Sequence, residues 1–501
     1  MQPESPTPSA LVFLLPLLIP MLGTARTAAR RLGFTDPDDA LAVAPTLLVS
    51  ALLVLVHFTT LLSQNFVFAL VSSFLILALP GMKTLLTQKD WKLYLAYFSP
   101  LAQHGMLLAT LILIAPTALN WSFHDELYIT GHWSVAAAIQ NGVYPPVNMN
   151  LPDLPLQYHY GFALLTAIVS SISGFSLPLS VDLLTLLSWC LTWLLLSRLA
   201  PRILPNVPHS WLLPVCVLFG AGLPYFCGDG IQRWLGVCIV DGLLVNPPII
   251  SYFFQHPWNL ALPIGFLLLL IHLRADDEEA KAAQGSYRIF GIALLLVALS
   301  MSQIAFFFAI YAVLLVCEFL AARRSSVLLA VLPFAIAIVF AKLGGGFFAS
   351  IQTESSSAHQ FSFKWGVVAQ PHDLLFWHFT AFGLGLPIGL LGISKLRRPA
   401  RLPVGLLILG GLTVLNFLDH ARDDAANKFA TIASLGFGLA ASAQIASIWS
   451  RKWPARVLLS AFIGAGVLFP VVFAWSPPEI PVSIYHKNPT QLDLHDVEMC
   501  R

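Results

Sequence analysis

Long apolar segments recur along the whole 501-residue chain, and they constrain its fold more than any other feature. A membrane-spanning helix needs about 20 mainly apolar residues, whereas a strand of a membrane barrel needs about 10 residues with alternating polarity. The clearest segments have the helical length and do not alternate. They are residues 41–62, 66–82, 93–119, 177–197, 374–394, 429–449 and 457–475.

Other apolar segments are shorter or interrupted by proline: residues 10–22, 161–173, 211–226, 258–273, 289–320, 327–342 and 402–418. With them, the length rule predicts an all-α polytopic integral membrane protein of about 12–14 transmembrane helices. One stretch is ambiguous. If residues 161–173 and 177–197 both span, Arg198 and Arg202 fall outside, so either one segment is a half-pass or residues 289–320 form one long helix.

Composition supports a membrane protein and excludes two other classes. Hydrophobic residues make up 57% of the chain and charged residues 10%, whereas soluble domains carry roughly 25% charge. Disorder requires low hydrophobicity and high charge. The net charge of +2 gives no electrostatic case for a nucleic-acid partner.

Basic residues concentrate in short loops, which marks those loops as cytoplasmic. This rule leaves residues 120–157, 344–372 and 419–428 outside. Asp36 is expected to cap the helix that begins at Pro37. The cytoplasmic clusters are Arg26, Arg30 and Arg31; Lys83, Lys89 and Lys92; Arg323 and Arg324; Lys395, Arg397, Arg398 and Arg401; and Arg451, Lys452 and Arg456.

The first outer loop contains the residues best suited to chemistry. The adjacent carboxylates of Asp125 and Glu126 could supply a general base and a metal ligand or orienting group. The alternative is a solvated loop whose carboxylates face water. The other candidates for substrate contact here are His124, Tyr144, Asp153, Tyr158 and His159.

Two later regions offer cationic groups. One is the segment from Asp419 to Lys428, which also contains Asn427. Its Arg422 and Lys428 could bind an anionic group, or the whole segment could be a polar hairpin tip. His256 precedes a predicted helix start, a favourable place for an anion, although a structural histidine fits equally well. Arg233 is a weaker candidate in the same region.

The cysteines form no zinc-binding pattern. Cys190, Cys216, Cys317 and Cys500 are expected to be small apolar residues. Cys227 and Cys238 share one loop and could form a disulfide if that loop is extracytoplasmic.

The order of the outer-loop motifs resembles the GT-C superfamily of integral-membrane glycosyltransferases. Asp125-Glu126 is similar to the acidic motif of its first outer loop, and Gly142-Val-Tyr144-Pro-Pro146 to the stretch that often follows. The closest likeness is to an uncharacterised bacterial branch. That likeness rests on Tyr158-His-Tyr-Gly161, His256-Pro-Trp-Asn-Leu-Ala-Leu-Pro263 and the late acidic loop ending in Asn427-Lys428-Phe429.

The resemblance implies transfer of a glycosyl group from a polyprenyl-phosphate sugar to an acceptor on the extracytoplasmic face, with inverting general-base chemistry. It implies Asp125 as the base and Glu126 as its support or as a metal ligand, with Mg²⁺ or Mn²⁺ an open option. His256, Arg422, Lys428 and Arg233 are the expected phosphate-binding residues. The expected partners are the lipid-linked donor, membrane lipids and other membrane proteins, in a bacterial inner membrane.

The same likeness divides the chain into an N-terminal transmembrane extension (1–92), a GT-C-like core (93–430), C-terminal transmembrane helices (431–475) and a short polar tail (476–501). The extension and the lack of a large C-terminal domain depart from the family pattern. A non-catalytic GT-C-like scaffold or complex subunit is one alternative function. A secondary transporter or flippase is another, with intramembrane His57, His104 and Lys342 as substrate or proton sites.

Overall fold

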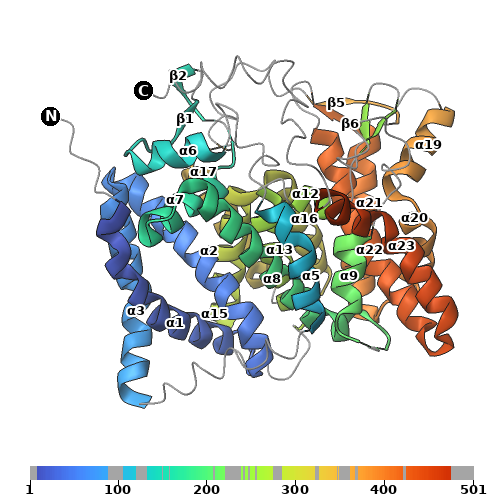
Figure 1. Ribbon diagram of the computed structural model, residues 1–501, viewed down its shortest axis with the longest axis horizontal. Helices are drawn as coiled ribbons and strands as arrows, with labels where there is room; N and C mark the ends of the chain where they lie inside the picture. The colour runs from blue at the N-terminus through green and yellow to red at the C-terminus, as the bar shows by residue number, and fades with distance from the viewer. Residues whose placement is uncertain are drawn as a thin grey trace.

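The computed structural model is a bundle of helices with short strands at one end (Figure 1). It describes residues 8–88, 105–119, 132–148, 151–156, 158–206, 209–220, 238–240, 243–245, 249–253, 257–274, 285–321, 327–346, 348, 361–366, 371–420 and 425–474. The predicted all-α polytopic class is confirmed.

The first half of the chain begins with a 3-10 helix, η1, that leads into α1. It continues with a series of helices, interrupted by two small antiparallel hairpins, β1–β2 and β3–β4. The elements are η1 (Pro8–Leu17), α1 (Leu18–Arg31), α2 (Pro37–Ser63), α3 (Phe66–Gln88), α5 (Gly105–Ala118), α6 (His132–Gln140), β1 (Val147–Asn148), β2 (Leu151–Pro155), α7 (Gly161–Ser173), α8 (Leu177–Ile203), α9 (Leu212–Phe219), β3 (Cys238–Val240), β4 (Leu243–Val245) and α12 (Ile249–Phe253).

The second half has longer helices and one strand pair, β5–β6, which joins two of the predicted outer segments. Its elements are α13 (Pro257–Leu273), α15 (Gly285–Ser302), α16 (Ile304–Ala321), α17 (Val327–Leu343), β5 (Phe361–Phe363), α19 (Pro371–Phe382), α20 (Gly385–Ile393), α21 (Arg398–Phe417), β6 (Leu418–His420), α22 (Ala425–Ser447), η6 (Trp449–Arg451) and α23 (Trp453–Ala474).

Among the described residues, eight helices are long and apolar enough to cross a membrane, and the pair α19–α20, bent by 76°, makes up to nine. The remaining apolar helices, of 10–17 residues, are α5, α7, α13, α17 and α23. The predicted total of 12–14 passes therefore requires that most of these shorter helices also cross.

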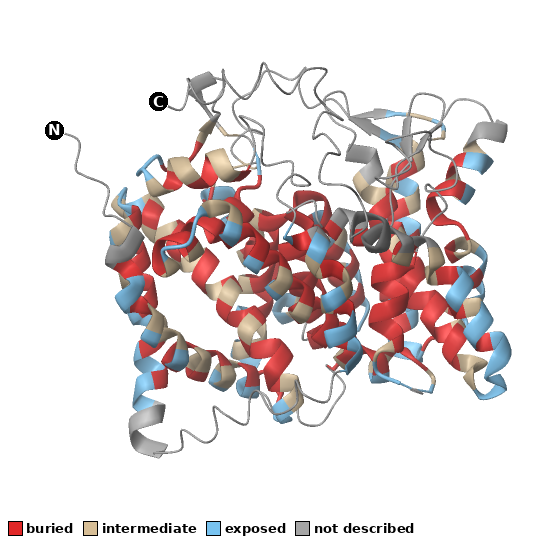
Figure 2. Cartoon of the chain, viewed as in Figure 1, coloured by how far each residue is buried: buried red, intermediate tan, exposed pale blue. Residues whose placement is uncertain are grey.

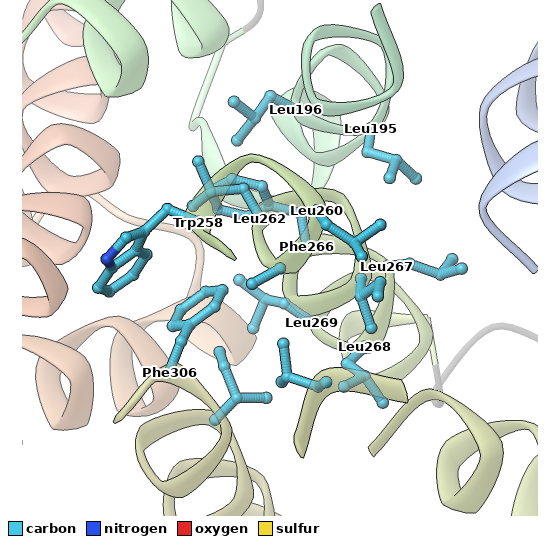
Figure 3. Packing of buried hydrophobic residues seen from close by; sticks show 14 of the residues in the cluster. Leu195, Leu196, Trp258, Leu260, Leu262, Phe266, Leu267, Leu268, Leu269 and Phe306 are labelled. Atoms are coloured by element: carbon cyan, nitrogen blue, oxygen red, sulfur yellow. The ribbon is translucent and has the colours of Figure 1, made fainter. Parts of the chain in front are cut away.

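The helices share one apolar core, which Figure 2 shows as a continuous buried zone through the middle of the bundle. Helix α13 lies at its centre and is buried on nearly all sides. Trp258 at its start contacts Phe306 of α16, with ring centroids 5.6 Å apart (Figure 3). A Cβ on Gly265 would meet the Phe306 ring at 2.4 Å, so glycine allows this close approach.

Helix α2 begins as the sequence predicts. The side chain of Asp36 accepts a hydrogen bond from the backbone N–H of Asp38 at 2.8 Å, and Pro37 occupies the first turn. Asp39, in the same turn, forms an ion pair with Arg274, which follows α13. Arg198 near the end of α8 bonds Asp38 at 2.6 Å and lies 3.9 Å from Asp39.

A second set of polar contacts adjoins this one. Glu318 at the end of α16 accepts from Arg288 at 2.6 Å and lies 2.7 Å from His272 of α13. Arg31 bonds the hydroxyl of Tyr287. We call these contacts of Arg31, Asp38, Asp39, Arg198, His272, Arg274, Arg288 and Glu318 the basic layer. It holds the ends of six helices together.

The basic layer resolves the topology that the sequence left open. Helices α15 and α16 are separate, with a break at Gln303. The start of α15 and the end of α16, which lie farthest from this break in sequence, meet through the ion pair of Arg288 and Glu318. The alternative of one long helix over residues 289–320 is therefore wrong, because two antiparallel helices occupy that segment.

The length and position of α7 favour it as the half-pass. It has 13 residues, about 20 Å of helix, which is shorter than the roughly 30 Å hydrocarbon core. Gln140 at the end of α6 donates to the Ala167 carbonyl at 3.3 Å and to the Ser171 hydroxyl at 3.1 Å. Helices α6 and α7 lie together at the end of the bundle that carries β1 and β2 (Figure 1), opposite the basic layer. Helix α8 then crosses, and Arg198 reaches the basic layer.

Cysteine labelling tests this topology. Asn141, Phe175 and Lys452 are exposed. Because α7 does not cross, an impermeant thiol reagent should label Asn141→Cys and Phe175→Cys from one side of the membrane and Lys452→Cys from the other. Labelling of Phe175→Cys together with Lys452→Cys would contradict the half-pass.

The basic layer should dominate stability at its end of the bundle. The side chains of Asp39 and Arg274 are 14% and 9% exposed, and removing one partner of a buried pair costs about 3–5 kcal/mol. We expect Asp39→Asn to lower the thermal unfolding midpoint in detergent, and Asp39→Asn with Arg274→Gln to cost less than the sum of the single changes. Strict additivity would show that the pair is not coupled.

Candidate functional site

A small, partly open pocket with a cavity volume of about 20 Å³ lies at the end of the bundle opposite the basic layer. It is formed where the last part of α2, the start of α7 and the ends of α15 and α17 meet. Its lining is aromatic and glycine-rich with two histidines, and none of the described lining residues carries a carboxylate. The lining residues are His57, Phe58, Tyr158, His159, Tyr160, Val297, Ser300, Met301, Phe340, Ala341, Gly344, Gly345, Gly346 and Phe348.

His57 lies on α2 and is 1% exposed. Its Nδ1 shares a hydrogen bond with the hydroxyl of Tyr144. The ring of His57 also contacts Phe58, with centroids 4.9 Å apart, and Tyr160, at 5.8 Å. The imidazole therefore links α2 to the loop that follows α6 and to the start of α7.

Tyr144 and Tyr160 are both buried, and their ring centroids lie 6.0 Å apart in an edge-on arrangement. The Tyr160 hydroxyl donates to the Gly344 carbonyl at 3.5 Å. Burial raises the pKa of both phenols, and for Tyr144 the neighbouring Tyr160 raises the pKa further. Both hydroxyls consequently stay protonated at neutral pH and can donate hydrogen bonds.

His159 is 3% exposed and stacks on Tyr158, with ring centroids 3.8 Å apart. Its Nε2 has no hydrogen-bond partner among the described residues. Burial lowers the pKa of His159 well below its ordinary value, and the positive charges of Lys428 and His132 lower the pKa further. The imidazole is therefore neutral at neutral pH.

Glycine lets α17 end against the pocket. A Cβ on Gly344 would lie 2.8 Å from Nε2 of His57, and one on Gly346 would lie 3.1 Å from the Tyr158 carbonyl oxygen. Gly346 also has φ of +58°, in the region that favours glycine. Side chains here would push apart the surfaces that form the pocket.

The structure brings together residues from three of the predicted motifs. Tyr144 comes from the Tyr-Pro-Pro stretch, Tyr158 and His159 from the Tyr-His-Tyr-Gly stretch, and Lys428 from the late loop. Lys428 lies in the first turn of α22, close enough to His159 to act on its pKa.

The other predicted site residues fall into two groups: three lie in described elements, and the rest lie outside the described ranges. Asp153 lies in β2, Asp419 in β6 and Asn427 in the first turn of α22, where the structure describes the backbone. Outside the described residues lie His104, His124, Asp125, Glu126, Cys227, Arg233, His256, Arg422 and Cys500.

Within the described ranges, no group of three His, Cys, Asp or Glu side chains is arranged to hold a metal ion. The predicted ligands Asp125 and Glu126 are outside those ranges. Cys190, Cys216 and Cys317 are free thiols inside the bundle or partly so, as the sequence predicts.

Sequence reasoning assigned His57 to a transport pathway or to an interior hydrogen bond, and the second assignment is confirmed. The sequence did not predict that the glycine turn at residues 344–346, Ser300 and Phe348 form part of the site. The available signal was three consecutive glycines at a membrane helix end, facing a predicted outer loop rich in tyrosine.

No protein-family model, curated protein or solved structure matches this chain. The fold and the apolar helices define its class by themselves: it is a multi-pass α-helical membrane protein with an aromatic pocket at the end opposite its basic layer.

The His57–Tyr144 contact gives a direct test of the site's construction. Tyr144→Phe removes the hydroxyl and leaves a buried imidazole nitrogen without its partner, at an expected cost of about 1–3 kcal/mol in unfolding free energy. In a double-mutant cycle with His57→Leu, the second change should cost less once the first is made. Independent effects would mean that the two groups do not interact.

Proposed function

We propose that this protein transfers a glycosyl group from a polyprenyl-phosphate sugar to an acceptor on the extracytoplasmic face of the membrane. The observation that carries the proposal is the convergence of Tyr144, Tyr158, His159 and Lys428 at the pocket end of the bundle. These residues come from motifs that resemble those of GT-C glycosyltransferases and are far apart in sequence.

The chemistry requires three things of the protein. A carboxylate must take the proton of the acceptor hydroxyl, in line with the departing phosphate. Cationic groups must lie where charge develops on that phosphate. An apolar surface must hold the polyprenyl chain.

Asp125 is the proposed base and Glu126 its support. The two side chains are adjacent in sequence, and on a helical or turn backbone they diverge by about 100°, so they serve different roles. Lys428, Arg422 and His256 are the proposed phosphate-binding residues, with Arg233 as a further candidate. Asp125 and Glu126 would also hold Mg²⁺ or Mn²⁺, which would add charge compensation at the phosphate.

The pocket suits a lipid donor because of its position. It lies at one end of the bundle, beside helices with apolar side chains on the outside. Phe340 and Leu343 in the last turns of α17 are 43% and 67% exposed, and Phe340 also lines the pocket. A lipid headgroup could therefore reach the pocket while its chain stays in the bilayer. The membrane we propose is the bacterial inner membrane.

Turnover of a lipid-linked sugar by the purified protein in nanodiscs tests the proposal. Asp125→Asn keeps the size and hydrogen-bonding capacity of the side chain but cannot accept a proton. It should lose about 10²–10⁴-fold in transfer rate while keeping donor binding. Glu126→Gln should lose less.

Asp90→Asn, in a loop predicted to face the cytoplasm, is the matched control and should transfer at the wild-type rate. Wild-type rates for Asp125→Asn would place the base elsewhere, with Asp153 the next candidate. Absence of turnover by the wild-type protein with polyprenyl-phosphate sugars would reject the enzyme and favour a non-catalytic scaffold.

A further inference from the structure

His159 is a buried polar group of the pocket that the proposed chemistry does not yet use, and unlike His57, whose Nδ1 bonds Tyr144, its ring forms no hydrogen bond to another side chain within the described residues. It lies outside the spanning helices, immediately before Tyr160 and α7, and lines the pocket directly. Its ring is held by the stack on Tyr158, and its Nε2 is without a hydrogen-bond partner in the described part of the chain. A buried polar atom in this state favours a ligand that supplies the missing bond.

The surroundings of His159 favour an anionic ligand over a cationic one. Among the described residues that line the pocket there is no carboxylate, so nothing there would compensate a cation. The positive charge of Lys428, in the first turn of α22, lowers the pKa of the imidazole and would attract an anion bound beside it.

Besides Lys428, the titratable groups around the imidazole in the described ranges are phenols and further imidazoles. Helices α15 and α17 contribute only uncharged residues to the lining. The titratable groups are Tyr158 and Tyr160 on its own segment, His57 on α2, His132 on α6 and Lys428 on α22.

We propose that His159 and Lys428 form an anion site that receives the phosphate of the lipid donor, with the imidazole becoming protonated as the phosphate binds. This assignment rests on the proposed function, which supplies the polyprenyl phosphate as the source of the anion. A phosphodiester oxygen accepts the hydrogen bond from Nε2, and the ammonium of Lys428 neutralises the remaining charge.

The proposed site makes the affinity for phosphate depend on pH in a defined direction. In the empty pocket burial and Lys428 hold the pKa of His159 below its ordinary value. A bound phosphate brings a negative charge beside the ring and raises that pKa. Between the two pKa values, binding takes up one proton, so affinity increases as pH falls, by up to about tenfold per pH unit. Above the bound-state pKa the dependence disappears.

The experiment measures binding to the full-length protein in nanodiscs between about pH 8 and about pH 6. The probe is farnesyl methyl phosphate, a phosphodiester whose own charge does not change in this range. Farnesyl methyl ether has the same chain without the phosphate, and dimethyl phosphate has the phosphate without the chain.

We expect the lipid phosphodiester to bind more tightly as pH falls, and the ether to bind at least tenfold more weakly with no pH dependence. His159→Gln should remove the pH dependence and about tenfold of the affinity at the lowest pH. Lys428→Gln should weaken binding at every pH.

His209→Gln is the matched control. His209 is exposed and stacks on Trp211, which in turn contacts Trp449. Trp449 follows the end of α22, whereas Lys428 lies in the first turn of that helix. This variant should bind as the wild type does. Circular dichroism and thermal unfolding of each variant verify the fold, and Lys428→Gln tests the site independently if His159→Gln fails to fold.

Equal affinity of ether and phosphodiester, or an unchanged pH profile in His159→Gln, would overturn the anion site even if sugar transfer is observed. Dimethyl phosphate binding as tightly as the lipid would overturn the lipid source of the phosphate. Expected binding without any sugar transfer would reject the proposed enzyme while leaving the phosphate site in place.

Discussion

The ion pair between Asp39 and Arg274, with Arg198 beside it, fixes the frame on which the rest of the molecule depends. It anchors the start of α2 to the ends of α8 and α13. His57 follows Asp39 on the same helix by 18 residues, or about 27 Å. Anchoring one end of α2 therefore sets the depth at which His57 enters the pocket at the other end.

Many polar side chains in the low-dielectric interior of the bundle form hydrogen bonds within the protein. Along α2, the hydroxyls of Thr46, Ser50 and Thr60 donate to backbone carbonyls one turn earlier, at 2.6–3.0 Å. Between helices, Asn259 donates to Thr185 at 3.1 Å and Trp189 to Thr110 at 3.2 Å. Other buried atoms, such as Thr192 Oγ1 and Asn259 Oδ1, also lack a partner in the described part of the chain, so it is the place of His159 in a pocket wall that favours a ligand.

The pocket assembles from segments that no local rule connects. A half-pass helix, α7, presents Tyr158, His159 and Tyr160 where α17 ends in glycine. Because α7 does not cross, its start and α8's start remain at the same end of the bundle, and α8 can return to the basic layer. The short helix α7 thus sets both the direction in which α8 runs and the position of the pocket residues that precede α7. The proposed glycosyltransferase activity makes use of both, since a lipid donor must meet the acceptor at one membrane surface.

The sequence by itself determined the class of protein, most of the spanning segments, the Asp36 cap of α2 and the clustering of basic residues at one end. These follow from segment length, local capping and charge, which depend on neighbouring residues alone. It also pointed to the outer loops as the site. Only the tertiary structure decided that α7 lies beside α6 at the pocket end of the bundle (Figure 1), that His57 bonds Tyr144 across 87 residues of sequence, and that Lys428 comes near enough to His159 to lower its pKa. Such contacts depend on how whole helices pack, and a one-dimensional pattern of polarity does not encode which distant side chains share a pocket.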